Sequence, residues 1–128
     1  MASGAISALK AARVTPLPPV TGQDADLAAV QRIITGDQYM SVYKPYKPEA
    51  DAAADMAVAL GRGETLDDIA QDRVNSPTTK EIPADLLTPV SLTVDNIKDT
   101  VVKDGMHTID QICTPEFMSA CEKAGLVR

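Results

Sequence analysis

The chain has 128 residues, enough for one domain by length, and its 45% hydrophobic and 23% charged residues are ordinary for a globular protein. Its net charge of −6 at pH 7 and pI near 4.6 argue against nucleic acid or an anionic membrane surface as a partner, because both attract basic proteins. No apolar run approaches the length of a transmembrane helix, so no direct membrane insertion is expected.

The first residues predict an amphipathic helix over residues 3–13, with Ile6 and Leu9 on one face and prolines after it. They lack the basic start and the continuous apolar stretch of a secretory signal, so we expect no signal peptide in this chain. Because the helical pattern is already under way at the first residues, we also expect that something upstream is missing.

A strand–helix–strand unit follows. Residues 19–22 predict a short buried strand, and residues 38–44 alternate as a second one. Between them the apolar spacing predicts a helix, which Asp24 or Asp26 can cap and which Gly36 ends. Such a unit predicts two parallel strands joined by a right-handed crossover.

The middle of the chain predicts one helix and several short extended pieces. Pro48 suits the first turn of an Ala-rich helix over residues 49–61, and residues 64–81 are polar and irregular. Residues 82–94 carry short apolar pieces split by two prolines, which predicts edge strands or extended crossing segments.

Three helical segments are expected in the last part of the chain. Asp95 can cap the first, Thr108 can begin the second, and the third is expected from Pro115 to Ala124. Four or five helices against about three strands predict an α/β fold. Its sheet should be short and largely parallel, with three to four strands and flanking helices.

Charged side chains follow both strands of the strand–helix–strand unit. Asp24 comes after the first strand and Lys44 ends the second, so both are expected at the carboxyl edge of the sheet, where open α/β folds bind small polar ligands. A carboxylate accepts hydrogen bonds from two neighbouring sugar hydroxyls, and an ammonium donates to a ring or hydroxyl oxygen. The pair therefore predicts ligand recognition and not catalysis.

Both residues also have simpler interpretations. Asp24 can be a helix cap, although Asp26 is the better cap and leaves Asp24 for a ligand. Lys44 can be a solvated lysine at a strand end. Gln23 and Tyr43 are candidates to support the site, but Gln23 can be a turn residue only, and alternation places Tyr43 on the core side of its strand.

Motifs of catalysis and cofactor binding are missing from the sequence. It contains no Gly-x-Ser-x-Gly elbow, no P-loop and no dinucleotide-binding glycine motif. His107 is the single histidine and has no Cys or His nearby in the sequence to form a metal site. We expect no cofactor, no bound metal and no enzymatic activity.

Two cysteines, Cys113 and Cys121, lie near the end of the chain at a spacing that fits neither a zinc nor a redox motif. They form either a local disulfide, which implies an oxidising compartment, or two unpaired buried thiols. A helix beginning at Thr114 would place Cys121 about two turns in and strain the limit of about 7 Å between the two Cα atoms. A bridge requires that helix to begin later, or the preceding chain to fold back.

Several segments resemble the C-terminal part of D-xylose-binding proteins of ABC sugar transporters. They are the run Val-Thr-Gly-Gln-Asp-Ala-Asp-Leu-Ala-Ala-Val-Gln-Arg-Ile at 20–33, the Val-Tyr-Lys-Pro at 42–45, and residues 4–10, 86–90 and 96–105. The resemblance implies a type I periplasmic-binding-protein fold, in which two α/β lobes close on a monosaccharide such as D-xylose. It also implies that Asp24 and Lys44 contact the sugar, that a membrane permease is the partner, and that the location is periplasmic or extracellular and membrane-associated. The Cys113–Cys121 tail looks like a variant of some members, which favours the disulfide.

In the resembling proteins, residues 1–45 would belong to the C-terminal sugar-binding lobe. Residues 46–81 would belong to the N-terminal lobe, and residues 82–128 would cross back and form a helical tail. This chain lacks the remaining N-terminal lobe, the first part of the C-terminal lobe and the family's Asn expected before the first helix, and residues 74–80 depart from the family's Asn-Asn-Gly-Lys-like stretch. We expect a truncated substrate-binding component. The alternatives are a half that self-associates through an exposed sheet edge, a non-binding remnant, and the sugar-sensing domain of a regulator or receptor.

Overall fold

The computed structural model describes residues 1–127, which divide into two units. The first unit combines residues 1–44 with the chain from Pro89 onwards, and the second unit is Pro45–Thr88. None of the helices in the described chain has both the length and the apolar character that crossing a membrane requires.

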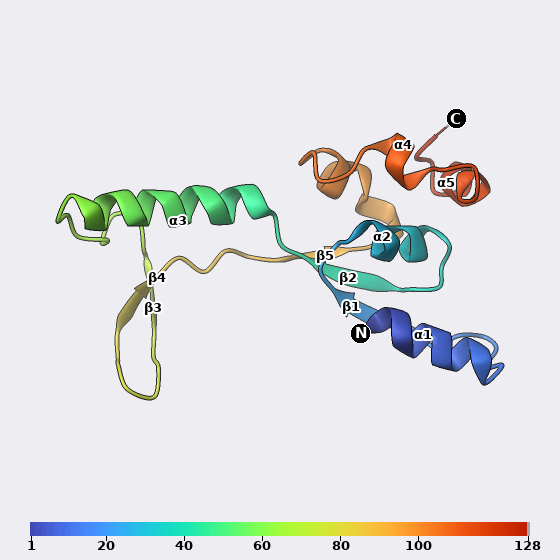
Figure 1. The fold of residues 1–128 in the computed structure, drawn as a ribbon, viewed down its shortest axis with the longest axis horizontal. Helices are drawn as coiled ribbons and strands as arrows, with labels where there is room; N and C mark the ends of the chain where they lie inside the picture. The colour runs from blue at the N-terminus through green and yellow to red at the C-terminus, as the bar shows by residue number, and fades with distance from the viewer. Residues whose placement is uncertain (128) are drawn as a thin grey trace. The chain divides into compact units, whose positions relative to one another are not determined.

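A three-stranded sheet forms the centre of the first unit, in the order β1 (Thr21–Gln23), β2 (Met40–Tyr43) and β5 (Val90–Leu92) (Figure 1). β1 and β2 are parallel, as the strand–helix–strand pattern predicts. β5 pairs antiparallel with β2, with Val90 opposite Tyr43, which the sequence did not indicate. The chain therefore leaves the sheet and returns to it at the same end.

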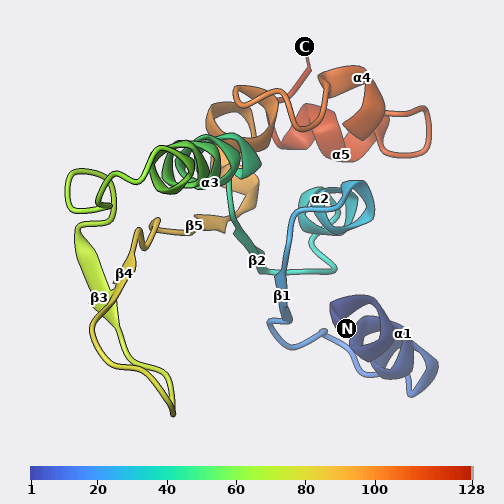
Figure 2. The same cartoon turned by 60° about the vertical axis from the view of Figure 1, so that its left-hand side comes forward.

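Two helices lie on opposite faces of this sheet: α1 (Ala2–Ala11) and α2 (Leu27–Ile34) (Figure 2). Asp26 caps α2, since its carboxylate accepts a hydrogen bond from the Ala29 amide at 2.8 Å. Gly36 follows the helix with φ +79°, a conformation that glycine adopts without strain. Both predicted ends of α2 are confirmed.

Four short helical segments form the end of the first unit: the 3₁₀ turn η1 (Val94–Asn96), the π-helical η2 (Lys98–Val102), α4 (Ile109–Ile112) and α5 (Met118–Lys123). Thr108 caps α4 as predicted. The prediction that Asp95 caps the first segment is wrong, because Thr93 and Asn96 form a reciprocal capping box there. The last helix begins at Met118 and not at Pro115.

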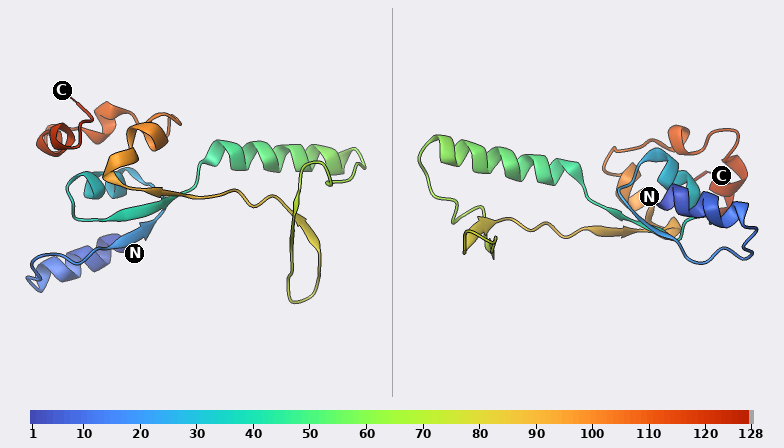
Figure 3. Two further views of the ribbon diagram at one scale, coloured as in Figure 1. Left: turned by 180° about the vertical axis from the view of Figure 1, so that it is seen from behind. Right: turned by 60° about the horizontal axis from the view of Figure 1, so that its bottom comes forward.

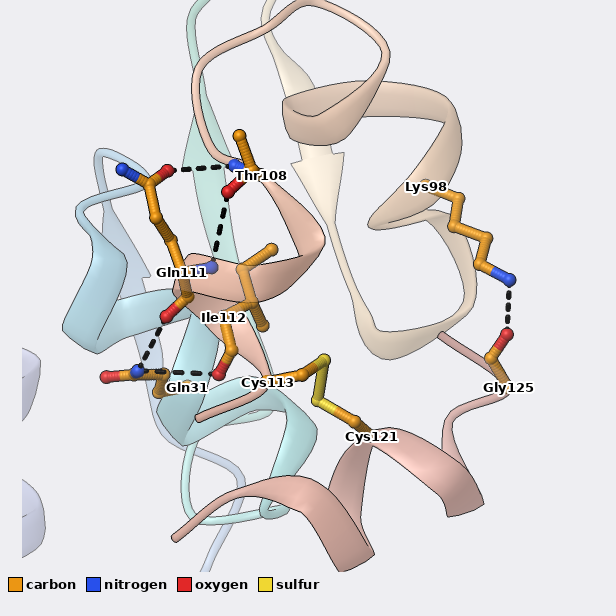
Figure 4. The surroundings of a disulfide bond; sticks show 8 residues. All are labelled: Gln31, Lys98, Thr108, Gln111, Ile112, Cys113, Cys121 and Gly125. Atoms are coloured by element: carbon orange, nitrogen blue, oxygen red, sulfur yellow. Dashed lines mark hydrogen bonds between the residues drawn. A yellow bond between two sulfur atoms is a disulfide. The ribbon is translucent and has the colours of Figure 1, made fainter. Parts of the chain in front are cut away.

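The late start of α5 allows the two cysteines to meet. Residues 114–117 form a turn, in which the Phe117 amide donates to the Thr114 carbonyl at 2.9 Å, and the Cα atoms of Cys113 and Cys121 lie 5.8 Å apart. The predicted disulfide is confirmed (Figure 4). Beside it, the Gln31 amide donates to the Ile112 carbonyl at 3.4 Å, so α2 and the tail are joined.

The core of the first unit lies between α2 and the tail. Its fully buried members come from distant parts of the chain: Val30, Leu92, Ile97, Val101, Ile112 and Cys121. Burying a side chain of this size is worth about 1.5–3 kcal/mol. The tail is therefore an integral part of the first unit.

The second unit contains the 16-residue helix α3 (Tyr46–Gly61) and an antiparallel hairpin of β3 (Asp72–Val74) and β4 (Ile82–Ala84) (Figure 3). The prediction that residues 64–81 are irregular is wrong at β3, whose polar residues give no strand pattern. Asp72 accepts a hydrogen bond from the Leu86 amide at 3.0 Å, and Arg73 pairs with Asp67 at 3.1 Å. The assignment of this unit to an N-terminal lobe stays a prediction.

We predict that the disulfide stabilises the first unit mainly by closing its tail. Replacing both cysteines with alanine should lower the free energy of unfolding by about 2.5 kcal/mol, the chain-entropy value for a separation of 8 residues. Urea unfolding would measure the difference. Reduction of the wild type measures the effect of the bond alone, because it breaks the disulfide and keeps both side chains. A reductant should destabilise the wild type and leave the double variant unchanged. Equal stability of oxidised and reduced wild type would contradict the prediction.

Candidate functional site

The two predicted site residues lie side by side at the carboxyl ends of the parallel strands. Asp24 directly follows β1 and Lys44 directly follows β2. The Lys44 Nζ lies 3.0 Å from a carboxylate oxygen of Asp24, and their side chains are 35% and 51% exposed. The structure thus brings together a donor and an acceptor that were predicted from strand positions alone.

The backbone of Asp24 is in the left-handed region, with φ +67°. Its amide donates to the Val42 carbonyl at 2.8 Å, and its carbonyl accepts from the Ser41 hydroxyl at 2.5 Å. Aspartate tolerates this region better than most residues, but glycine would adopt it without strain. Asp24 therefore occupies a backbone position at which glycine would be less strained.

The ion pair adds little to stability. Partly exposed pairs contribute about 0–1 kcal/mol, because water screens their attraction. A carboxylate and an ammonium at this distance offer acceptor and donor atoms to an incoming molecule that carries several hydroxyl groups. The pair therefore presents an acceptor and a donor at the surface and contributes little to stability.

The neighbours of the pair have different positions. Tyr43 is 2% exposed and its hydroxyl donates to the Asp104 carboxylate at 2.9 Å, so its predicted packing in the core is confirmed. Gln23 is exposed and ends β1. It lines, with Asp24, a groove of about 620 Å³ between the start of α1, β1 and the first turns of α2. Lys44 does not line this groove.

The polar groups on the floor of this groove already have partners within the protein. Gln38 is 1% exposed, accepts from Arg32 at 3.1 Å and donates to the Met40 carbonyl at 3.0 Å. A Cβ at Gly22 would lie 2.5 Å from the Gln38 amide nitrogen, so only glycine fits there. The groove is therefore closely packed beside Gly22 and Gln38, and of the predicted site residues it is lined by Asp24 and Gln23.

His107 has a partner in the backbone and not a metal site. Its Nε2 lies 2.7 Å from the Ala25 carbonyl. Within residues 1–127, no three His, Cys, Asp or Glu side chains are grouped so that they could hold a metal ion.

A family model described as "Periplasmic binding protein domain" matches residues 1–65, which is half of the chain and includes the parallel strands with Asp24 and Lys44. The chain belongs to this family. The α/β fold class predicted from the sequence is confirmed, since two solved structures that share the arrangement are also solute-binding proteins.

Curated members of the periplasmic binding protein family resemble the chain over most of its length. The D-xylose-binding periplasmic protein of Haemophilus influenzae is 46% identical over 111 residues, and that of Escherichia coli is 45% identical over 106 residues. These matches cover 87% and 83% of this chain but only 32% and 31% of the relatives. The resemblance to D-xylose-binding proteins is confirmed, and the chain spans about a third of their length. Both relatives are named as binding proteins and not as enzymes.

Two solved structures share the arrangement. A solute-binding protein of an ABC transporter from Clostridium phytofermentans, with bound β-D-glucose, has a TM-score of 0.77 and 30% identity, covering 87% of this chain and 34% of its own. A carbohydrate transporter solute-binding protein from Chloroflexus aurantiacus, in complex with D-glucose, has a TM-score of 0.66 and 32% identity, covering 73% of this chain and 26% of its own. This periplasmic binding protein domain therefore has the fold of a sugar-binding protein segment.

Three residues that support the pair were missed in the sequence. Ser41 is fully buried and holds the Asp24 carbonyl; a small hydroxyl within an apolar strand was the signal that could have identified it. Asp104 and His107 contact the residues beside Lys44 and Asp24 across 61 and 82 residues of sequence. Nothing local in the sequence indicates those two contacts.

We predict that the Asp24 position prefers glycine to alanine. Both substitutions remove the carboxylate, but only glycine fits φ +67° without strain, so Asp24→Gly should be more stable than Asp24→Ala by about 1 kcal/mol. Urea unfolding of the two variants checks this. The same pair of substitutions at Gln23, inside β1, serves as the control and should favour alanine. If the alanine variant at position 24 were as stable as the glycine variant, the prediction that this backbone conformation is strained for alanine would be wrong.

Proposed function

We propose that this chain is the substrate-binding component of an ABC-type sugar transporter, and that Asp24 and Lys44 contact a monosaccharide such as D-xylose. The observation that carries the proposal is the half-exposed pair at the ends of two parallel strands, with Asp24 in a backbone conformation suited to glycine. The names of the similar curated proteins support the choice of D-xylose.

Recognition would rest on hydrogen bonds alone. The two oxygens of the Asp24 carboxylate accept from neighbouring hydroxyls of the sugar, and the Lys44 ammonium donates to a further hydroxyl or to the ring oxygen. No proton transfer or nucleophile is needed, so the proposed role is binding and not catalysis. A membrane permease would receive the sugar in the periplasm. The names of the relatives support the periplasmic location.

A second lobe would supply the other wall of the site. We assign residues 46–81 to that N-terminal lobe, residues 1–45 to the C-terminal lobe, and residues 82–128 to the return crossing and the tail. Val58 and Leu60, near the end of α3, are 50% and 61% exposed, which supports the assignment because exposed apolar patches often mark surfaces that further protein covers.

We predict that the chain alone binds D-xylose only weakly, because a sugar site needs walls on both sides to exclude water. Titration with D-xylose, followed by backbone amide NMR, should give a millimolar Kd and shifts confined to residues near Asp24 and Lys44. L-xylose is the matched control ligand, and Asp24→Asn should abolish the shifts while keeping the side-chain shape. Shifts that persist in Asp24→Asn, or that L-xylose reproduces, would reject the assignment of the pair. A micromolar Kd would contradict the prediction that the site needs a second wall for tight binding.

We also propose self-association through the edge of β1 as a second candidate. Among residues 1–127, β1 pairs only with β2. The Val20 carbonyl and the Asp24 amide both bond toward β2, and backbone groups alternate in direction along a strand. The N–H and C=O groups of Thr21 and Gln23 therefore face outward, where a strand of another copy can pair.

For this second candidate we predict that Thr21→Pro lowers the mass measured by light scattering at high protein concentration. Proline removes one outward N–H and leaves the bonds to β2 intact. Thr21→Val keeps that N–H and is the matched control, so it should associate like the wild type. A wild type that is monomeric at all concentrations would exclude the edge as a self-association site.

A further inference from the structure

The loop of residues 103–108, here called the tail loop, contacts both sides of the candidate site. The Asp104 carboxylate accepts a hydrogen bond from the Tyr43 hydroxyl at 2.9 Å, and Tyr43 directly precedes Lys44. The His107 Nε2 lies 2.7 Å from the carbonyl of Ala25, which directly follows Asp24. One short loop thus reaches the residue next to each member of the pair.

The tail loop is itself fixed to the core. The amides of Met106 and His107 both bond to the Val101 carbonyl, at 2.9 and 3.1 Å, and Val101 is fully buried. Gly105 has φ +72°, which permits the reversal between η2 and these bonds. The Asp104 amide donates to the Thr100 carbonyl at 2.9 Å. The loop can therefore hold other groups in place.

The bond from His107 restrains the peptide that follows Asp24. A carbonyl oxygen only accepts, so the Nε2 atom carries the proton in this contact. Ala25 is 1% exposed, and Asp26 beyond it is fixed as the cap of α2. The left-handed Asp24 is thereby held from β2 on one side and from the tail loop and the cap on the other.

The bond to Asp104 restrains the end of β2. The ring of Tyr43 is buried in the core, and its hydroxyl reaches Asp104 at the surface. Holding both ends of this side chain limits rotation of the strand end that carries Lys44. The contact can act on the lysine through the backbone, because Tyr43 and Lys44 are consecutive residues.

We propose that Asp104 and His107 are positioning residues that set the geometry of the Asp24–Lys44 pair and thereby the affinity for its ligand. The effect on affinity depends on the proposed sugar binding, whereas the effect on the pair does not. The tail loop would then form part of the binding machinery, although it lies far from the pair in sequence.

The experiment compares removal with conservative replacement at each position. His107→Ala and Asp104→Ala remove the contacts, while His107→Gln keeps a donor and Asp104→Asn keeps an acceptor. Lys103→Ala, at an exposed neighbour in the same loop, is the control. For each variant we would measure the ¹³C resonance of the Asp24 carboxylate without ligand, the Kd for D-xylose and the free energy of unfolding.

Both alanine variants should shift the Asp24 carboxylate resonance and raise the Kd for D-xylose about tenfold. Losses of about this size follow when a residue that hydrogen-bonds a metal ligand, without touching the metal, is removed. The Gln and Asn variants should recover most of the affinity, and Lys103→Ala should match the wild type. Wild-type resonance and affinity in both alanine variants would overturn the proposal. The proposal would also be overturned if the alanine and the conservative variants lost the same affinity, in proportion to their loss in free energy of unfolding. That pattern would indicate a purely structural role.

The two proposals fail in different ways. If the wild type shows no D-xylose binding while the alanine variants still shift the Asp24 resonance, the proposed function is wrong and the positioning role stands. If D-xylose binds and Asp24→Asn abolishes binding, but the alanine variants at 104 and 107 change nothing, only the positioning role is wrong.

Discussion

The pairing of two short parallel strands fixes the geometry on which the candidate site depends. The Asp24 amide and carbonyl bond to Val42 and Ser41 of β2, which hold the aspartate in a left-handed conformation that it would rarely adopt alone. The same register places Lys44 beside it. Hydrogen bonds to the backbone of Asp24, and not the weak attraction between the two charges, therefore determine where the carboxylate and the ammonium lie.

The tail makes this short sheet stable enough to hold the pair. Three strands of three or four residues have little apolar surface of their own, and two-stranded or thin sheets need a packed face to persist. Ile97, Val101 and Ile112 supply that face against α2, and the disulfide that follows them closes residues 113–121, whose two cysteines belong to the same core. Binding geometry at the strand ends and burial in the tail are therefore parts of one structure.

The sequence predicted the parts that local chemistry determines. Asp26 and Gly36 mark the ends of α2, the alternation of residues 38–44 marks β2, and the strand ends point to Asp24 and Lys44. The sequence did not predict elements that depend on a partner distant in the chain, or whose residues show no strand or cap pattern. Asp72, Arg73 and Val74 do not alternate, so β3 depends on pairing with β4. Asp is by itself a better N-cap than Thr, but Thr93 and Asn96 satisfy two backbone amides reciprocally, which residue preference alone does not predict. The contacts of Asp104 and His107 require the folded tail.

The antiparallel pairing of β5 with β2 has a consequence for how the first unit is built. Tyr43 and Val90 are opposite each other, so the chain that departs after Lys44 and arrives at Pro89 does so at adjacent points. Antiparallel neighbours with adjacent ends need only a tight two-residue turn to connect them. In topological terms the 44 residues between them are an insertion in a β-hairpin, a kind of position where domains are exchanged without disturbing the host. Evolution or an engineer can replace that insertion and keep Asp24 and Lys44 in register, because the strand pairing that places them does not pass through it.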